Sequence, residues 1–99
     1  MSRDLQESLR MWIEAVACGL VEPEDRGAVS AVVRMPAGAG VVVALAVPAR
    51  SMPYVVGRRG SNADAIRTLT KAACRTLGWT GRVEVRIDAV GLDSDERPL

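Results

Sequence analysis

The sequence contains no histidine and no phenylalanine, and its aromatic residues are limited to two tryptophans and one tyrosine. Without histidine, the chain has no imidazole to act as a general base near neutral pH or to ligate a metal ion. The two cysteines, Cys18 and Cys74, cannot supply the four ligands of a structural zinc site by themselves. Both stand in segments with helical periodicity, where reduced, packed thiols are expected. We therefore expect no metal, no cofactor and no enzymatic activity, and a reducing, cytoplasmic setting.

Long apolar runs are also missing from the chain. The longest uncharged stretch covers residues 35–49 and contains two prolines and two glycines. It is shorter than the roughly 20 residues that a membrane-spanning helix needs. The charged residues Arg3 and Asp4 stand where a signal peptide would lead into its apolar segment. We expect neither a signal peptide nor contact with a membrane.

What the chain does contain is typical of one small globular domain. Hydrophobic residues make up 48% and charged residues 25% of its 99 residues, which suits a folded chain with one modest core. Residues 1–90 hold the periodic segments and are predicted to form this domain. Residues 91–99 carry three acidic residues and no periodic pattern, so we expect them to form an acidic, disordered tail.

The formal net charge of +1 hides an uneven distribution. Residues 1–49 carry a net charge of −2 and residues 83–99 a net charge of −3. Residues 50–82 hold seven basic residues against one acidic residue, a net charge of +6. A basic stretch of this kind attracts a polyanion locally even when the whole chain is almost neutral. The alternative is an ordinary solvated helix face.

The first half of the chain predicts a helix and a β-hairpin. Two runs rich in β-branched residues, 28–35 and 41–47, flank a turn of small residues, which indicates antiparallel strands. The second run is apolar on both faces, as expected of a covered, central strand. The helix is predicted from apolar residues at three- and four-residue spacing; they are Leu5, Leu9, Trp12, Ile13, Val16 and Leu20.

The second half predicts two helices and a last strand. Ser51 is expected to cap a short helix that ends near Val56. A second helix is expected to start at Ser61 or Asn62 and to end at Gly78. The final segment alternates aliphatic and charged residues, as in a half-exposed strand. This order predicts an α+β domain with a mixed three-stranded sheet, a parallel last strand and all helices on one face. The apolar face predicted for the longer helix holds Ile66, Leu69, Ala73 and Leu77.

The tetrapeptide Gly57-Arg58-Arg59-Gly60 joins these two helices. Glycines let the backbone approach a sugar-phosphate chain without a Cβ atom in the way, and arginines form charge-assisted bonds to phosphate oxygens. The start of the next helix directs free amides and a partial positive charge to the same place. The alternative is a plain corner with solvated arginines. A second GxxG segment, 78–81, leads from a helix into a strand and is interpreted as a connector in which Trp79 packs.

The segment Val55-Val56-Gly57-Arg58-Arg59-Gly60, followed by Ala65-Ile66-Arg67-Thr68-Leu69-Thr70-Lys71-Ala72-Ala73, resembles the signature of KH domains. It is most similar to the small bacterial single-domain KH proteins of the KhpA type, and the order of elements resembles the type II KH arrangement. The resemblance covers roughly residues 4–90. It implies a single-stranded RNA-binding module whose GxxG loop clamps the backbone of about four nucleotides.

The resemblance also implies where the bases lie, in a groove between the two helices and the adjacent strand. Val55, Val56, Ile66 and Leu69 would support or line its aliphatic floor. Single-stranded DNA is a second ligand of the same chemistry. The RNA-binding residues that the resemblance implies are Val55, Val56, Gly57, Arg58, Arg59, Gly60, Ser61, Asn62, Ile66 and Arg67.

Some residues near the loop depart from the family pattern. Ala63 replaces a bulky aliphatic residue, Asp64 replaces a residue that is often basic, and Pro53-Tyr54 replaces a common Gly-Lys pair. Ala63 and Asp64 slightly favour a second interpretation, a KH fold that binds proteins as a homodimer or with a second, KhpB-like KH protein. The first helix with Trp12, or the connector with Trp79, would then form the contact.

Overall fold

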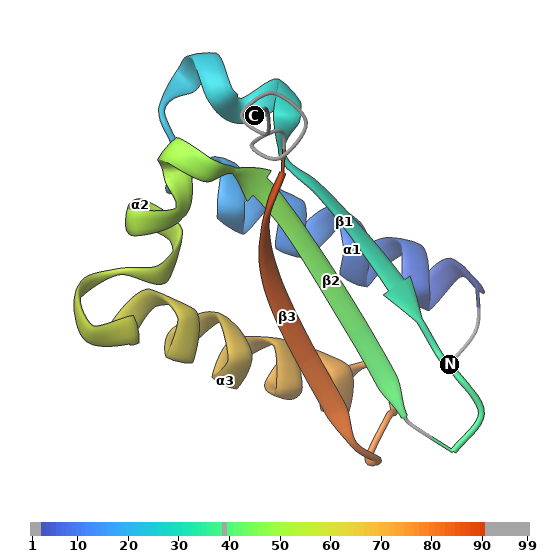
Figure 1. Cartoon of the computed structure of the whole chain (residues 1–99). Coiled ribbons are helices and arrows are strands. Elements are labelled where there is room, and N and C mark those ends of the chain that lie inside the picture. Colours follow the sequence, from blue (N-terminus) through green and yellow to red (C-terminus); the bar gives the residue numbers. More distant parts are fainter. Residues whose placement is uncertain (1–2, 39, 91–99) are drawn as a thin grey trace.

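The computed structural model describes residues 3–38 and 40–90 (Figure 1). The predicted acidic tail, residues 91–99, lies outside the described residues. The helices and strands follow the predicted order; they are α1 (Arg3–Cys18), β1 (Ser30–Arg34), β2 (Val41–Pro48), α2 (Met52–Val56), α3 (Ser61–Thr76) and β3 (Val83–Val90). The described part also contains the 3₁₀ turns η1 (Pro23–Ala28), η2 (Ala49–Ser51) and η3 (Arg58–Gly60).

The three strands form one mixed sheet with the order β1-β2-β3. β1 pairs antiparallel to β2, with Val33 opposite Val43, and β2 pairs parallel to β3, with Val43 beside Val85. β2 is therefore the central strand, as its two apolar faces predicted. The α+β class, the hairpin and the parallel last strand are confirmed.

The core lies between this sheet and the helices. Along β2, every second side chain is fully buried, from Val41 to Val47, because successive side chains of a strand point to opposite faces. Leu9 and Ile13 of α1, four residues apart, are also fully buried against this layer. Figure 1 views the sheet from its other face, with α1 behind the strands. The helices cover one face of the sheet, as predicted.

The buried face of α3 differs from the predicted one. Leu69 is 52% exposed, whereas Ala63, Ile66 and Thr70 are buried. Thr70 lies in the core because its hydroxyl donates a hydrogen bond of 2.6 Å to the carbonyl of Ile66, which removes the cost of burying a polar group. The helical pattern predicted Leu69 on the apolar face, whereas Thr70 occupies the buried position next to it. The prediction for Leu69 was wrong.

Ser51 precedes α2 as predicted, but its side chain does not cap the helix. Its hydroxyl is buried and donates a hydrogen bond of 2.8 Å to Oδ2 of Asp25 in η1. Nε of Arg50 donates to both carboxylate oxygens of Asp25, at 3.0 and 3.1 Å. These bonds stabilise the ionised carboxylate and hold the pKa of Asp25 below its usual value; the bond from Arg50 has the larger effect and the bond from Ser51 the smaller. Arg50, counted within the basic stretch, is therefore committed to an internal ion pair.

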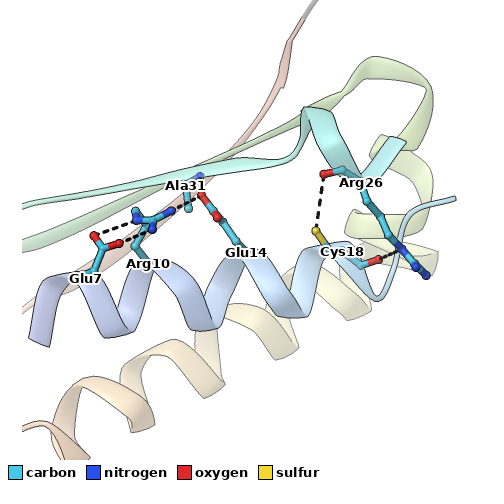
Figure 2. A network of polar contacts seen from close by, with 6 residues as sticks. All are labelled: Glu7, Arg10, Glu14, Cys18, Arg26 and Ala31. Atoms are coloured by element: carbon cyan, nitrogen blue, oxygen red, sulfur yellow. Dashed lines mark hydrogen bonds and ion pairs between the residues drawn. The ribbon is translucent and has the colours of Figure 1, made fainter. Parts of the chain in front are cut away.

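A polar contact also joins α1 to β1 (Figure 2). The backbone amide of Ala31 donates a hydrogen bond of 2.8 Å to Oε2 of Glu14. Arg10 lies between Glu7 and Glu14 and donates to both, with a distance of 2.8 Å to Oε2 of Glu14. Among the described residues β1 pairs only with β2, so Glu14 satisfies an amide on the other edge of β1.

Across residues 3–38 and 40–90, none of the helices has the length and apolar character needed to cross a membrane. Both cysteines carry free thiols: Cys74 is buried in the core, and Cys18 is half-buried. Burial raises the pKa of the Cys74 thiol, which keeps it protonated and unreactive at neutral pH.

Candidate nucleic-acid interface

The loop between α2 and α3 begins at Gly57, which ends α2. Its amide donates a hydrogen bond of 3.0 Å to the carbonyl of Pro53, and its backbone then turns to φ +78° and ψ 173°. This conformation is almost restricted to glycine. A Cβ atom at Gly57 would also lie 2.7 Å from Cγ of Asn62 and 2.8 Å from its backbone nitrogen. Both the backbone conformation and the close approach therefore call for glycine here.

The loop continues as the single turn η3. The amide of Gly60 donates to the carbonyl of Gly57 at 3.1 Å, and the amide of Ser61 donates to the carbonyl of Arg58. Arg59 has a left-handed backbone, with φ 54° and ψ 28°, which is uncommon for a residue other than glycine and costs about 1 kcal/mol. The turn therefore holds a strained arginine at the centre of the loop.

This strained turn places cationic groups on the outside of the molecule. Arg58 and Arg59 are exposed, and neither side chain forms a hydrogen bond or ion pair with any residue in 3–38 or 40–90. The bonds within the loop use the amides of Gly57, Gly60 and Ser61, and the amides of Arg58 and Arg59 take no part in them. In Figure 1 the loop projects at the left, away from the sheet. Two guanidinium groups and two amides thus lie beside one exposed turn.

Asn62 braces the loop from the first turn of α3. Its side-chain nitrogen donates a hydrogen bond of 2.8 Å to the carbonyl of Tyr54 in α2. Sequence reasoning treated Asn62 as a contact for RNA, whereas the structure gives its amide group an internal partner. Ser61, the first residue of α3, is exposed beside the loop.

The predicted aliphatic residues occupy different depths. Val55 is fully buried and Ile66 is 2% exposed, so both belong to the core and support the loop from beneath. Val56 is half-buried and Leu69 is exposed. Only these last two can contact a ligand without a change in the fold. The prediction therefore grouped two buried core residues, Val55 and Ile66, with two residues that are accessible at the surface.

Arg67 lies where α3 meets the free edge of β3. Its Nε donates a long hydrogen bond of 3.4 Å to the carbonyl of Val85, and its guanidinium lies 3.7 Å from a carboxylate oxygen of Asp64. Both side chains of this ion pair are well exposed, so the pair is weak. Arg67 can therefore exchange its partner for a phosphate at little cost.

The remaining cations of the basic stretch lie at the other end of α3. Lys71 and Arg75 of α3 line a surface hollow of about 250 Å³ together with Arg82, which precedes β3, and Trp79. Sequence reasoning did not select these residues for a site. The signal that could have found them is the four-residue spacing of Arg67, Lys71 and Arg75, which places them along one side of a helix.

Comparison of the sequence with models of known protein families gives no match, and comparison with curated proteins gives none. Comparison of the fold with solved structures gives the crystal structure of Era in complex with MgGDPNP and nucleotides 1506–1542 of 16S ribosomal RNA, with a TM-score of 0.61 and 16% sequence identity. Era is a KH-domain GTPase. The fold is KH-like. The match covers 87% of this chain and 32% of the Era chain, so this chain spans about a third of the length of that protein.

Proposed function

We propose that this protein binds single-stranded RNA, with the loop Gly57–Gly60 against the sugar-phosphate backbone. The observation that carries the proposal is the exposed loop itself, in which Arg58 and Arg59 have no partner among residues 3–38 and 40–90. The likeness in fold to Era, whose structure contains ribosomal RNA, supports the same ligand class. We propose binding without catalysis.

The loop and the start of α3 would act together on a phosphate. α3 has 16 residues, and no side chain caps its first turn at Gly60, so the partial positive charge of the helix end is not offset there. Two arginines beside this helix end supply long-range attraction and charge-assisted hydrogen bonds to phosphate oxygens. Asp64, in the first turn of α3, opposes part of this field, and because its ion pair with Arg67 is weak, the positive excess comes from Arg58 and Arg59. The local charge therefore favours an anion.

The bases would lie beside the loop, along the half-buried side chain of Val56 and the exposed side chain of Leu69. Aliphatic contacts of this kind suit a domain that has three aromatic residues and lacks a stacking platform on its sheet. We propose a type II KH arrangement similar to the KhpA type, acting in the cytoplasm. Single-stranded DNA presents the same phosphates, and a parallel titration with a DNA oligonucleotide would compare the two ligands.

The decisive experiment reverses the charge of the loop. We expect the double variant Arg58→Asp, Arg59→Asp to lose RNA affinity by more than tenfold. We expect it to melt at an unchanged temperature, because both side chains are exposed and neither is paired with a residue that the structure describes. Fluorescence anisotropy with a labelled 12-nucleotide oligouridylate at two salt concentrations measures the affinity.

A control with the same net charge is available on the helix-free face of the sheet. Arg34→Asp with Arg86→Asp reverses two exposed arginines that lie on β1 and β3. We expect this variant to bind RNA with an affinity within about threefold of that of the unmodified protein, because salt screens exposed charges that lie away from the contact. RNA affinity that is equal in the loop variant and in the unmodified protein would exclude the loop as the contact.

A second candidate function is protein interaction, as a homodimer or with a second KH protein. The observation that favours it is an apolar hollow of about 370 Å³ between α1 and α3. Trp12, Leu9 and Leu77 line it, and Trp12 remains half-buried. Size-exclusion chromatography with light scattering tests self-association: a dimer that Trp12→Ala dissociates would support this function, and a monomer would count against a homodimer.

A further inference from the structure

The charged residues that line the hollow at the C-terminal end of α3 are all cationic. Lys71 and Arg75, one turn apart on α3, line it together with Arg82 from the connector before β3. None of the described residues that line it is acidic. Like charges that gather around one space repel one another, and a bound anion relieves this repulsion.

These three cations have no partner among the described residues. None of their side chains forms a hydrogen bond or ion pair within the part of the chain that the structure describes. Four of the eight other arginines whose side chains the structure describes are paired with an acidic residue; these are Arg10, Arg50, Arg67 and Arg86. The charge of the hollow is therefore available to a ligand.

The backbone around the hollow is held in place. The carbonyl of Arg82 accepts a hydrogen bond of 2.9 Å from the amide of Val41 and one of 3.1 Å from Nε1 of Trp79. The indole ring lies against Gly81, where a Cβ atom would approach Cζ2 of Trp79 to 2.7 Å. The rim of the hollow thus has a fixed backbone and a half-buried aromatic ring before any ligand binds.

A row of basic residues connects this hollow with the loop. Arg67, Lys71 and Arg75 follow one another at four-residue spacing, about 6 Å per step along the helix axis. The row follows the seam between α3 and β3, because Arg67 donates to the carbonyl of Val85 and the hollow reaches Val83. Lys71 and Arg75 lie about 15 and 21 Å from the start of α3 along its axis.

A nucleic-acid strand that passes the loop can therefore reach the hollow. At the rise of about 3.4 Å per nucleotide that a stacked, helical strand has, these 15 to 21 Å correspond to roughly four to six nucleotides. We propose that the hollow is a second phosphate-binding subsite, which holds backbone phosphates four to six nucleotides away from those at the loop. This inference rests on the proposed function, because the strand must first bind at Gly57–Gly60. Inorganic phosphate shares this chemistry, and the experiment distinguishes the two sources.

Length dependence is the first signature of a two-point contact. We expect the unmodified protein to bind a 12-nucleotide oligouridylate at least tenfold more tightly than a 4-nucleotide one, because only the longer strand spans both positions. Lys71→Ala with Arg75→Ala removes two exposed charges and keeps good helix formers in α3. We expect this variant to bind the 12-mer about tenfold more weakly and the 4-mer with unchanged affinity. The slope of log affinity for the 12-mer against log salt concentration should become shallower by about 1.4, because two phosphate contacts are lost.

The control Arg34→Ala with Arg86→Ala removes the same net charge from the helix-free face of the sheet and should leave both affinities unchanged. If the unmodified protein binds both lengths equally, or if the hollow variant keeps its affinity for the 12-mer, the subsite is refuted and the proposed function stands. If the unmodified protein binds neither oligonucleotide, the proposed function itself fails.

Two further readouts separate the sources of phosphate. In a Trp12→Phe background, Trp79 is the remaining tryptophan, and we expect its emission to change with the 12-mer but not with the 4-mer. Thermal melts with inorganic phosphate test a free anion site. A rise in melting temperature that depends on Lys71 and Arg75, with no dependence of RNA affinity on length, would show a small-anion site and overturn the subsite for RNA.

Discussion

Two glycines at the ends of one loop contribute in different ways. Gly57 has φ +78° with an extended ψ of 173°, and a Cβ atom there would collide with Asn62. Gly60 has φ +78° with ψ 13°, a left-handed conformation that other residues adopt at moderate cost, and no atom lies within 4 Å of its Cβ position. The GxxG pattern does not distinguish the two positions, whereas in the structure only Gly57 combines a glycine-specific backbone with a steric clash.

This difference predicts unequal effects of the same substitution. We expect Gly57→Ala to lower the free energy of unfolding by about 3 kcal/mol, from strain and the clash with Asn62, and Gly60→Ala to lower it by about 1 kcal/mol. Urea denaturation followed by circular dichroism measures both. Gly60→Asn serves as the control, since asparagine tolerates the left-handed region. Equal losses at the two glycines would contradict this account of the loop.

At the scale of elements, the free edges of the sheet are met by side chains from helices. Glu14 of α1 accepts the amide of Ala31 on β1 (Figure 2), and Arg67 of α3 donates to the carbonyl of Val85 on β3. Exposed strand edges are sites of unwanted pairing between chains. The 2.8 Å bond from Ala31 is the stronger of the two contacts, and it fixes where α1 lies on the hairpin.

Removal of this contact should affect β1 more than the rest of the domain. We expect Glu14→Ala to lower the free energy of unfolding by about 1 to 2 kcal/mol, because it leaves the amide of Ala31 without its charged acceptor. Hydrogen exchange at the Ala31 amide should accelerate in the variant. Glu7→Ala, which breaks only an exposed pair with Arg10, should leave this exchange rate unchanged. Equal protection of Ala31 in all three proteins would argue against the contact.

At the scale of the whole molecule, one polar cluster connects segments that lie 25 residues apart in the chain. Asp25 of η1 is 4% exposed, and it is held by Arg50 and Ser51 of η2, the turn that precedes α2. The cluster thereby fixes the turn after α1 against the segment that leads into the loop. Because these bonds favour the ionised carboxylate, its folded-state pKa is lower than its ordinary value of 3.8.

The lowered pKa gives this cluster a defined pH dependence. Its contribution to stability is complete above pH 3.8, the ordinary pKa of the carboxyl, and is lost as pH falls from there through the lower folded-state pKa. We expect Asp25→Asn to melt at a lower temperature than the unmodified protein at pH 7, and the two melting temperatures to converge toward pH 2. Thermal melts across this range test it; a gap that stays constant with pH would refute the account.

Much of the site could be predicted from the sequence, but not how deeply each side chain is buried. The position of the loop between two helices, the start of α3 and the cationic character of Arg58 and Arg59 were all predicted. Val55 and Ile66 were assigned to the same floor as Val56, although the first two are buried in the core. Spacing along a chain defines a face of a helix but not how far that face lies beneath a neighbouring element.

The order of elements, the central place of β2 and the glycine loop were determined by the sequence alone, because periodicity and turn chemistry act between residues that are close along the chain. Tertiary structure decided which charges remain free. Arg50 and Arg58 look equivalent in the sequence, yet Arg50 meets Asp25 from η1 and Arg58 meets no partner among the described residues. Such pairings join segments that are distant in the chain, and only the packing of the whole domain brings them together.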